Sequence, residues 1–328
     1  MDYLPFPVFS VLPVVEYLRI MPPSVYVIIL SYNGSRWLEA CLASVMATDY
    51  SNLEVILVDN ASSDNCVELV RKRYPQVTVI VNNYNYGYSE GNNVGIISAI
   101  CAGADYVVLL NQDTKVTPHW LNEIISVGES DEKIGILGSV QLNYDNNDLN
   151  SWTLSAMNGD LDELRDPARA RRWIPVEWVE GSCFVIKRQV LEKIGLLDPI
   201  YFAFYEEIDF CRRAEYNGFR VALVPRSRIH HFRGGSWQEN RKIERDRNYR
   251  CDRSQFIYSL TDPRKSLTGN LLSYLVTLGS KSKELLLDFD RQRAFDLLSI
   301  QIDVLSNGRK LFGKWRRERL PLRKGLTA

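Results

Sequence analysis

Runs of apolar residues with the length of β-strands alternate with segments of helical periodicity in the first third of the chain. The runs VYVIILS (25–31), EVILVD (54–59), VTVIV (77–81) and YVVLL (106–110) have the length and content of buried strands. Apolar residues between the first two runs, at positions 37, 38, 41, 42 and 45, follow the 3.6-residue period of an amphipathic helix. Strands that alternate with helices form parallel sheets covered on both faces. The pattern therefore predicts a doubly wound α/β sheet.

Two further helices are expected between the later strands. Asp64 is placed to cap the N-terminus of a helix that runs through Val70. A helix that begins near Ser89 should bury one apolar face, made of Val94, Ile97 and Cys101.

The alternation becomes less regular after residue 134. IGILGSV (134–140) and GSCFVIK (181–187) are predicted strands, and RQVLEKIG (188–195) is a predicted short helix. Residues 264–328 show helical patterns and no strand signal.

Composition and charge exclude several classes of protein. The 328 residues include 40 basic and 40 acidic side chains, a balance that argues against a nucleic-acid partner. The six cysteines show no CxxC pair and no zinc spacing, which is typical of reduced, mostly buried thiols in a cytosolic protein. The first residues carry charges and prolines without a basic n-region, so we expect no signal peptide. No uninterrupted apolar run reaches the roughly 18–20 residues of a spanning helix.

Polar residues follow each of the four predicted strands. Because ligands of such sheets bind beyond the carboxyl ends of the strands, these four tips should converge on one rim. They read Ser31-Tyr32-Asn33-Gly34, Asp59-Asn60-Ala61-Ser62-Ser63-Asp64, Asn82-Asn83-Tyr84-Asn85-Tyr86-Gly87-Tyr88 and Asn111-Gln112-Asp113-Thr114.

Familiar nucleotide-binding motifs are missing from these tips. YNGSRW (32–37) stands where a dinucleotide fold has GxGxxG, and neither a P-loop nor the Gly-rich basic loop of a sugar-nucleotide pyrophosphorylase is present. An aspartate at the second tip can accept the N3–H of uracil or thymine. An aspartate at the fourth tip can ligate a divalent cation on a diphosphate. A simple turn residue is the alternative interpretation for both Asp59 and Asp113.

The segments VYVIILSYNG, VILVDNASSD, NNYNYGYSEGNNVGI and VVLLNQDT resemble, in order, the strand tips of the family 2 glycosyltransferases with the GT-A fold. The rhamnosyltransferase-like branch is the most similar, and the resemblance covers roughly residues 24–260. It implies a Rossmann-like, mostly parallel sheet flanked by helices, with a C-terminal helical extension. We therefore expect an N-terminal extension (1–23), a GT-A catalytic domain (24–240) and a C-terminal helical region (241–328).

The resemblance assigns roles to residues at the tips. Asp59 would contact the base, and Asp113 would be the last residue of the metal-binding DxD motif. Asn111 replaces the first aspartate, so His231 in HHFRGGS (230–236) would share the Mg²⁺ or Mn²⁺ ion. The nucleotide sugar would lie among Ser31, Tyr32, Asn33, Asp59, Asn85, Gly87, Asn93, Asn111, Gln112, Asp113 and Arg253.

Three arginines could neutralise the diphosphate, namely Arg233, Arg250 and Arg253. A solvated charged face explains each of them equally well. Trp178 and Gly181-Ser182-Cys183 match the acceptor side of the family, and a buried strand is the alternative interpretation for them.

The acidic segment YEEID (205–209) is expected to supply the general base of an inverting transferase. The resemblance gives this role to Glu207, with Glu206 as the second candidate. We expect Asp209 to cap or orient the following helix. A solvated helix N-terminus would explain the acids without chemistry, although the apolar YFAFY (201–205) before them favours a pocket wall.

The resemblance implies metal-assisted, inverting transfer of rhamnose or a similar sugar from a dTDP- or UDP-sugar. The acceptor would be a glycan or a polyprenyl-diphosphate-linked glycan in cell-surface polysaccharide synthesis. A catalytically silent nucleotide- or glycan-binding relative is one alternative, because of Asn111 and Glu207, and an assembly scaffold is another.

The basic tail RKLFGKWRRERLPLRKG (309–325) could lie on an anionic membrane surface. The protein would then be cytoplasmic and peripheral on the inner face of the membrane. A helix packed on the catalytic domain, or a homodimer interface, explains the tail equally well.

Overall fold

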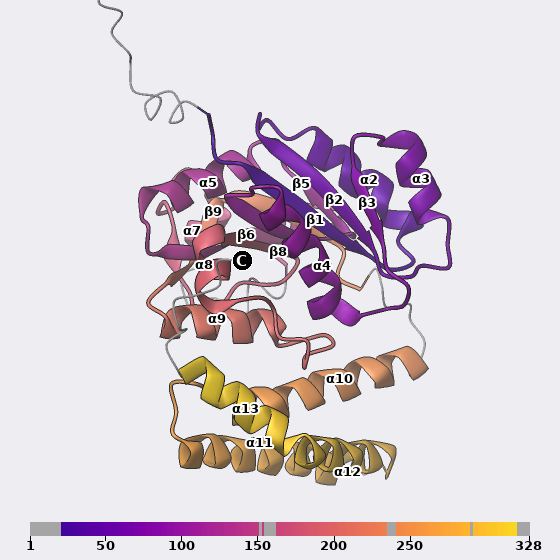
Figure 1. Cartoon of the computed structure of the whole chain (residues 1–328), viewed down its shortest axis with the longest axis vertical. Coiled ribbons are helices and arrows are strands. Elements are labelled where there is room, and N and C mark those ends of the chain that lie inside the picture. Colours follow the sequence, from indigo (N-terminus) through magenta and orange to yellow (C-terminus); the bar gives the residue numbers. More distant parts are fainter. Residues whose placement is uncertain (1–20, 151–152, 154–161, 235–240, 289–290, 320–328) are drawn as a thin grey trace, which may run out of the picture.

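The computed structural model describes residues 21–150, 153, 162–234, 241–288 and 291–319. Within these residues a mixed nine-stranded sheet carries helices on both faces, and a separate layer of helices lies beneath it (Figure 1). Most of the predicted N-terminal extension, residues 1–20, lies outside the described residues.

The first half of the chain forms the parallel part of the sheet, as predicted. Its strands pair in the order β3-β2-β1-β4, all parallel. Its elements are β1 (Val25–Ser31), α2 (Ser35–Met46), β2 (Leu53–Asp59), α3 (Cys66–Arg73), β3 (Thr78–Val81), α4 (Gly87–Cys101) and β4 (Tyr106–Asn111).

The second half extends this sheet with strands of both directions, in the order β4-β8-β6-β9-β5. Strand β8 runs antiparallel to β4 and β6, which accounts for the less regular sequence pattern after residue 134. The elements are β5 (Thr114–Val116), α5 (Trp120–Ser130), β6 (Ile134–Asn143), α7 (Asp162–Arg165), β7 (Ile174–Pro175), β8 (Cys183–Lys187), α8 (Arg188–Ile194), α9 (Glu206–Tyr216) and β9 (Arg220–His231).

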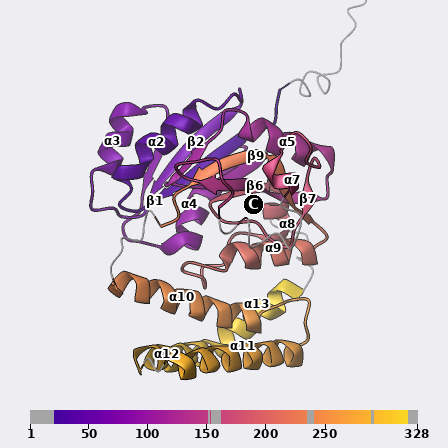
Figure 2. The ribbon, with the colours of Figure 1, turned by 180° about the vertical axis from the view of Figure 1, so that it is seen from behind.

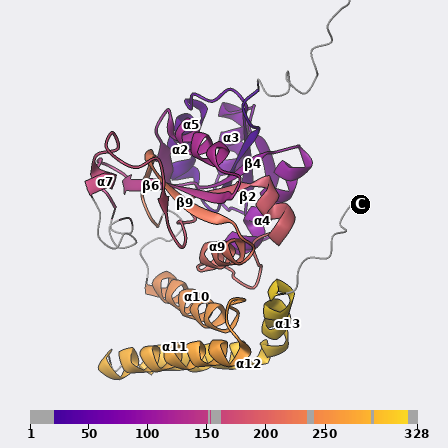
Figure 3. The same cartoon turned by 90° about the vertical axis from the view of Figure 1, so that its left-hand side faces the viewer.

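Apolar side chains cover both faces of the sheet. Helices α2, α3 and α5 pack on one face, where Leu38, Val70 and Trp120 are buried. Helices α4, α8 and α9 pack on the other, through residues such as Ile96 and Phe210 (Figure 3). This two-sided burial explains why the parallel strands read as continuous apolar runs.

The prediction that α4 buries an apolar face containing Ile97 and Cys101 is wrong. Ile97 is 51% exposed and Cys101 is exposed, whereas the helix buries small and polar residues, including Gly91 and Gly95. A Cβ atom at Gly95 would lie 2.5 Å from Ile28 of β1. The helix therefore packs by close backbone approach, which a search for large apolar residues does not detect.

The predicted cap of α3 is displaced by one residue. Asn65 occupies the N-cap position and makes no side-chain cap hydrogen bond. The Asp64 carboxylate instead accepts from the backbone N–H of Cys66, at 3.2 Å, and of Ser35, at 2.9 Å. Asp64 thus joins the first turns of α3 and α2.

The C-terminal helices form the layer beneath α9. They are α10 (Arg241–Leu260), α11 (Leu267–Asp288), α12 (Arg291–Ser306) and α13 (Gly308–Arg319). Figure 2 shows α11 and α12 at the far end of the molecule, with α10 and α13 between them and α9. A small core joins the layer to the loop before α9 through Tyr201, Phe256 and Ile300. Within the described residues, no helix combines the length and apolar character needed to cross a bilayer.

Candidate active site

Gln112 ties together the tips of β1 and β4. Its Oε1 accepts from Ser31 Oγ at 2.9 Å and from the backbone N–H of Tyr32 at 3.2 Å, and its Nε2 donates to the Tyr32 carbonyl at 3.2 Å. The amide packs over Gly34, where a Cβ atom would lie 2.0 Å from Oε1. Ser31 and Gln112 are therefore buried and shape the rim through the backbone they hold.

Asn33 and Asp59 connect the loops after β1 and β2. Asn33 has a positive φ of 50°; its N–H donates to Ser62 Oγ and its Oδ1 accepts from Ser63 N–H. Asp59 lies opposite Ser31 in the strand register, and its Oδ2 accepts from Ser62 N–H at 3.2 Å. The turn interaction proposed as the alternative for Asp59 is thus present at the predicted base-binding position.

Asn60 organises the loop after β3 and was missed by the sequence reasoning. Its Nδ2 donates to Asn85 Oδ1 at 2.9 Å and to the Gly87 carbonyl at 3.0 Å. Its Oδ1 accepts from Asn82 Nδ2 and from the Tyr86 N–H. Its place in the sequence could have identified it, since Asn60 directly follows Asp59 at a strand tip. Asn85 and Gly87 therefore belong to a loop held rigidly against β2.

Two residues of α4 hold the loops that precede α9. Gly87 has a φ of +77°, and a Cβ atom there would lie 2.4 Å from the Phe202 carbonyl, so only glycine fits without strain. Asn93 uses both ends of its amide on the backbone of Leu197, at 2.8 and 3.1 Å. Asn93 therefore holds α4 against the loop at Leu197 and does not lie at the rim.

Asp113 and His231 meet where β4 ends and β9 ends. The His231 Nε2 lies 3.4 Å from Asp113 Oδ1, and both side chains are almost fully buried. The other ring nitrogen, Nδ1, donates to Gln141 Oε1 at 3.0 Å, and this oxygen also accepts from Asn150 Nδ2. Because Gln141 holds the proton on Nδ1, the lone pair of Nε2 faces Asp113, as in metal-binding histidines.

This donor set fits a divalent cation that takes its remaining ligands from a diphosphate. Among the described residues there is no group of three or more His, Cys, Asp or Glu side chains that could hold a metal alone. A carboxylate and an imidazole suit Mn²⁺ better than Mg²⁺, which prefers oxygen ligands throughout. The Asn111 Nδ2 lies 3.4 Å from His231 Nε2, so this amide would have to turn its oxygen inward to become a third ligand.

Three glutamates form an acidic cluster between α9 and the segment before β8. Glu180, Glu206 and Glu207 each have a buried carboxylate oxygen without a hydrogen-bond partner. The Tyr88 hydroxyl lies among them and donates to the Gly181 carbonyl at 2.5 Å. Buried carboxylate oxygens normally have partners, so this cluster is arranged to receive a polar ligand.

Burial raises the pKa of both candidate bases. It raises the pKa of Glu207 to about 7, with the negative charge of Glu180 adding to the effect. Burial, together with the charge of Glu207, raises the pKa of Glu206 well above its ordinary value. The pKa of Glu207 lies where a carboxyl can act as acid or base at neutral pH.

Of the two roles expected for Asp209, capping and orienting the helix, the structure supports the second: Asp209 does not cap α9. It lies inside the helix, fully buried, and binds Arg212 at 2.6 Å, Arg213 at 3.0 Å and Lys314 of α13 at 3.0 Å. These three cations hold the pKa of Asp209 well below its usual range despite its burial. The residue fastens α9 to α13 and thereby orients the helix that carries Glu207.

The three candidate arginines lie at different places. Arg253 donates to Asp303 of α12 at 2.7 Å and to the Ile200 carbonyl at 2.8 Å, within the helical layer. Arg250 stacks over Phe202. Arg233 follows β9 and lies 3.5 Å from Glu180, so it connects the His231 side of the site with the acidic cluster.

A continuous backbone path joins these groups. The Asn111 N–H donates to the Ser182 carbonyl at 3.0 Å, and Leu110 pairs with Cys183 in the sheet. The segment 180–183 therefore lies beside Asn111 at Ser182 and contributes Glu180 to the acidic cluster. Trp178, in the same segment, packs against the core between α9 and the sheet.

Comparison with known proteins shows similarity to glycosyltransferases. A hexosyltransferase of low-salt glycan biosynthesis from Haloferax volcanii, Agl10, is 30% identical over 174 residues, covering 51% of this chain. That alignment spans 55% of the Haloferax protein, so the chain matches little more than half of its length. An N-acetylglucosaminyl-diphospho-decaprenol L-rhamnosyltransferase of Mycobacterium tuberculosis is 24% identical over 234 residues, covering 64% of this chain and 76% of that protein.

Solved glycosyltransferase structures have a similar fold. The mannosyltransferase PcManGT of Pyrobaculum calidifontis, solved with GDP-Man and Mn²⁺, superposes with a TM-score of 0.55 at 16% identity, covering 93% of this chain and 92% of that one. The model of the glycosyltransferase-like family 2 matches residues 22–250. With this match and the GT-A-type sheet, the chain is a member of glycosyltransferase family 2.

Proposed function

We propose that the protein catalyses inverting transfer of a hexose from a nucleotide-diphosphate sugar to the hydroxyl of a glycan or lipid-linked acceptor. The observation that carries the proposal is Glu207, a buried carboxylate with an unpartnered oxygen and a pKa raised to about 7. A base of this pKa is suited to remove a proton at neutral pH. The rhamnosyltransferase among the relatives makes dTDP-rhamnose the first donor to test.

The rim would bind the nucleotide end of the donor. Asp59, at the tip of β2, would accept a hydrogen bond from the base, and the loop held by Asn60 would line the same side. Asp113 and His231 would hold a divalent cation, which would neutralise charge on the diphosphate. Arg233 brings a further cation to this end of the site.

Glu207 would carry out the proton transfer. Its carboxylate takes the proton of the acceptor hydroxyl while the oxygen forms a bond to the anomeric carbon. The bond from that carbon to the diphosphate oxygen breaks on the opposite face, and its electron pair leaves with the nucleoside diphosphate. Burial and the charge of Glu207 raise the pKa of Glu206, and in its protonated form Glu206 would donate a hydrogen bond within the site.

A donor-hydrolysis assay tests the proposal without knowledge of the acceptor. Release of dTDP or UDP from nucleotide sugars should require Mn²⁺ or Mg²⁺ and be lost in Asp113→Ala. Glu207→Gln should keep nucleotide binding, measured as thermal stabilisation, and lose turnover. Stabilisation by nucleotide sugars without any turnover would instead identify a silent binding protein.

A further inference from the structure

The outer surface of α11 and α12 is apolar, although nothing in the described chain covers it. Nine large apolar side chains there are between 52% and 72% exposed. They are Leu267, Leu271, Leu272, Leu275 and Val276 on α11, and Phe295, Leu298, Ile302 and Leu305 on α12. Soluble monomers rarely expose apolar side chains in such number on neighbouring helices. We refer to these nine residues as the outer apolar face.

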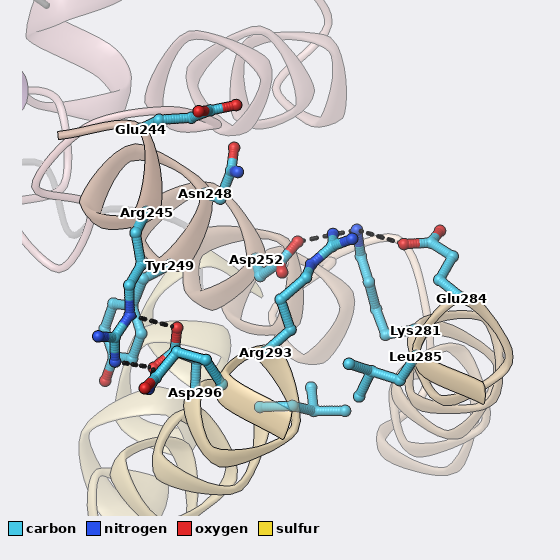
Figure 4. Close-up of a pocket in the computed structure, with 12 residues that line it drawn as sticks. Glu244, Arg245, Asn248, Tyr249, Asp252, Lys281, Glu284, Leu285, Arg293 and Asp296 are labelled. Atoms are coloured by element: carbon cyan, nitrogen blue, oxygen red, sulfur yellow. Dashed lines mark hydrogen bonds and ion pairs between the residues drawn. The ribbon is translucent and has the colours of Figure 1, made fainter. Parts of the chain in front are cut away.

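Polar and ionic contacts occupy the opposite side of the same helices. A cavity of about 410 Å³ lies between α10, α11 and α12, and Arg245–Asp296, Lys281–Asp252 and Lys281–Glu284 form ion pairs in its lining (Figure 4). The two carboxylates of α12, Asp296 and Asp303, are bound by Arg245 and Arg253 of α10 at 2.8 and 2.7 Å. The acidic groups of α12 are therefore directed inward, away from the outer apolar face.

The exposed charges near this face are predominantly basic. On α12 and α13 every exposed charged residue in the described chain is an arginine or lysine. They are Arg291, Arg309, Lys310, Arg316, Arg317 and Arg319. Helix α13 follows α12 directly, and its Trp315 donates to the Lys265 carbonyl just before α11 at 3.3 Å. The basic residues of α13 thus border one end of the apolar helices.

We propose that the outer apolar face docks on the surface of a bilayer that contains anionic phospholipids. Among its described side chains, helix α11 carries one exposed acid, Glu284, which pairs with Lys281 at the cavity. Apolar residues bordered by Lys and Arg are typical of helices that lie in a membrane interface. A second copy of the chain fits less well. A two-fold interface would bring the same patch against itself and offer the exposed basic residues of α12 and α13 no exposed acid on those helices of the described chain.

The proposed membrane-facing surface on α11 and α12 differs from the surface expected from the sequence, which was the basic tail (309–325). In α13, Leu311 and Lys314 are buried, and Lys314 binds Asp209 of the catalytic part. The described portion of the tail is therefore a packed helix, which was one of the alternatives left open. The membrane-facing apolar residues come from α11 and α12, whose sequences carry little charge at the exposed positions.

Vesicle flotation of the full chain tests the proposal without any sugar donor, so its result is independent of the transfer reaction. The wild-type protein should float with phosphatidylcholine–phosphatidylglycerol vesicles, and salt should weaken this binding. Leu275→Asp with Ile302→Asp should reduce the bound fraction at least tenfold. Arg316→Glu with Arg317→Glu should remove the preference for phosphatidylglycerol.

Ile97→Asp is the matched control, because Ile97 is an equally exposed apolar residue on α4, away from the layer. It should bind vesicles like the wild type. Equal melting temperatures of all variants show that folding is intact. If the double aspartate variant melts at a lower temperature, Leu275→Gln with Ile302→Gln is used in its place. Unchanged flotation of the double variant overturns the proposal. So does a wild-type dimer in light scattering that Leu275→Asp dissociates, because a second copy would then cover the face.

Discussion

Replacing Glu207 by glutamine should make the free protein more stable at alkaline pH while it abolishes transfer. The pKa of the folded-state carboxyl is about 7 against 4.5 when unperturbed, because burial disfavours the charged form. The proton held by Glu207 therefore stabilises the fold fully below pH ~4.5, and this contribution is lost as the pH rises through about 7. A difference of about 2.5 pKa units corresponds to about 3 kcal/mol, most of which disappears between pH ~5 and ~8.

Urea unfolding at a series of pH values measures this effect. The wild-type free energy of unfolding should fall by about 2–3 kcal/mol more than that of Glu207→Gln between pH ~5 and ~8. Burying the glutamine amide changes the free energy of unfolding equally at every pH. The informative quantity is therefore the slope of this free energy against pH. Burial also raises the pKa of Glu318 to about 7, and this acid contributes the same slope to both proteins.

Glu206→Gln should flatten the slope as well, because burial and the charge of Glu207 also raise the folded-state pKa of Glu206 above its ordinary value. Donor turnover should fall about 10²–10⁴-fold in Glu207→Gln, as expected for loss of a general base. Identical slopes for wild type and Glu207→Gln would show that this carboxyl does not titrate near neutrality, and the reasoning that makes it the base would fail.

Three further outcomes follow from contacts in the site. Glu180→Gln should move the acidic limb of the turnover–pH profile to lower pH, because the charge of Glu180 raises the pKa of Glu207; an unmoved limb would refute this coupling. His231→Ala should lose the thermal stabilisation that Mn²⁺ gives in the presence of a nucleoside diphosphate, whereas full retention would remove the residue from the metal site. Lys314→Met should lower the free energy of unfolding by about 3 kcal/mol, since Asp209 keeps two arginines but loses a buried cation; a change within experimental error in urea titrations would contradict this.

The alternation of strands and helices, the parallel sheet and the family could be predicted from the sequence because each rests on local patterns. Buried parallel strands are continuous apolar runs, and their polar tips follow immediately. The packing of α4 could not be predicted from apolar periodicity, because Gly91 and Gly95 make its contacts through the absence of a side chain. The cap at Asp64 was displaced because its carboxylate also serves α2, a contact between residues 29 positions apart.

Pairings between distant parts of the chain explain the remaining differences. Asp209 resembles a helix cap in sequence, and its true partner, Lys314, is 105 residues away. Asn93 resembles a ligand-binding amide, and its partner is the backbone of Leu197. The pairing of Asp113 with His231 was anticipated only through the family resemblance, since the two residues lie 118 positions apart and meet through the end of β9.

The bond between Lys314 and Asp209 has a consequence for how the enzyme is made. During synthesis the strands and the helix with Glu207 leave the ribosome long before α13. Until then Asp209 lacks one of its three cations, and α9 lacks its attachment to the end of the chain. Chains that stop before α13 would contain all the strand tips and α9, but α9 would lack the cation that fastens it to the C-terminal helices.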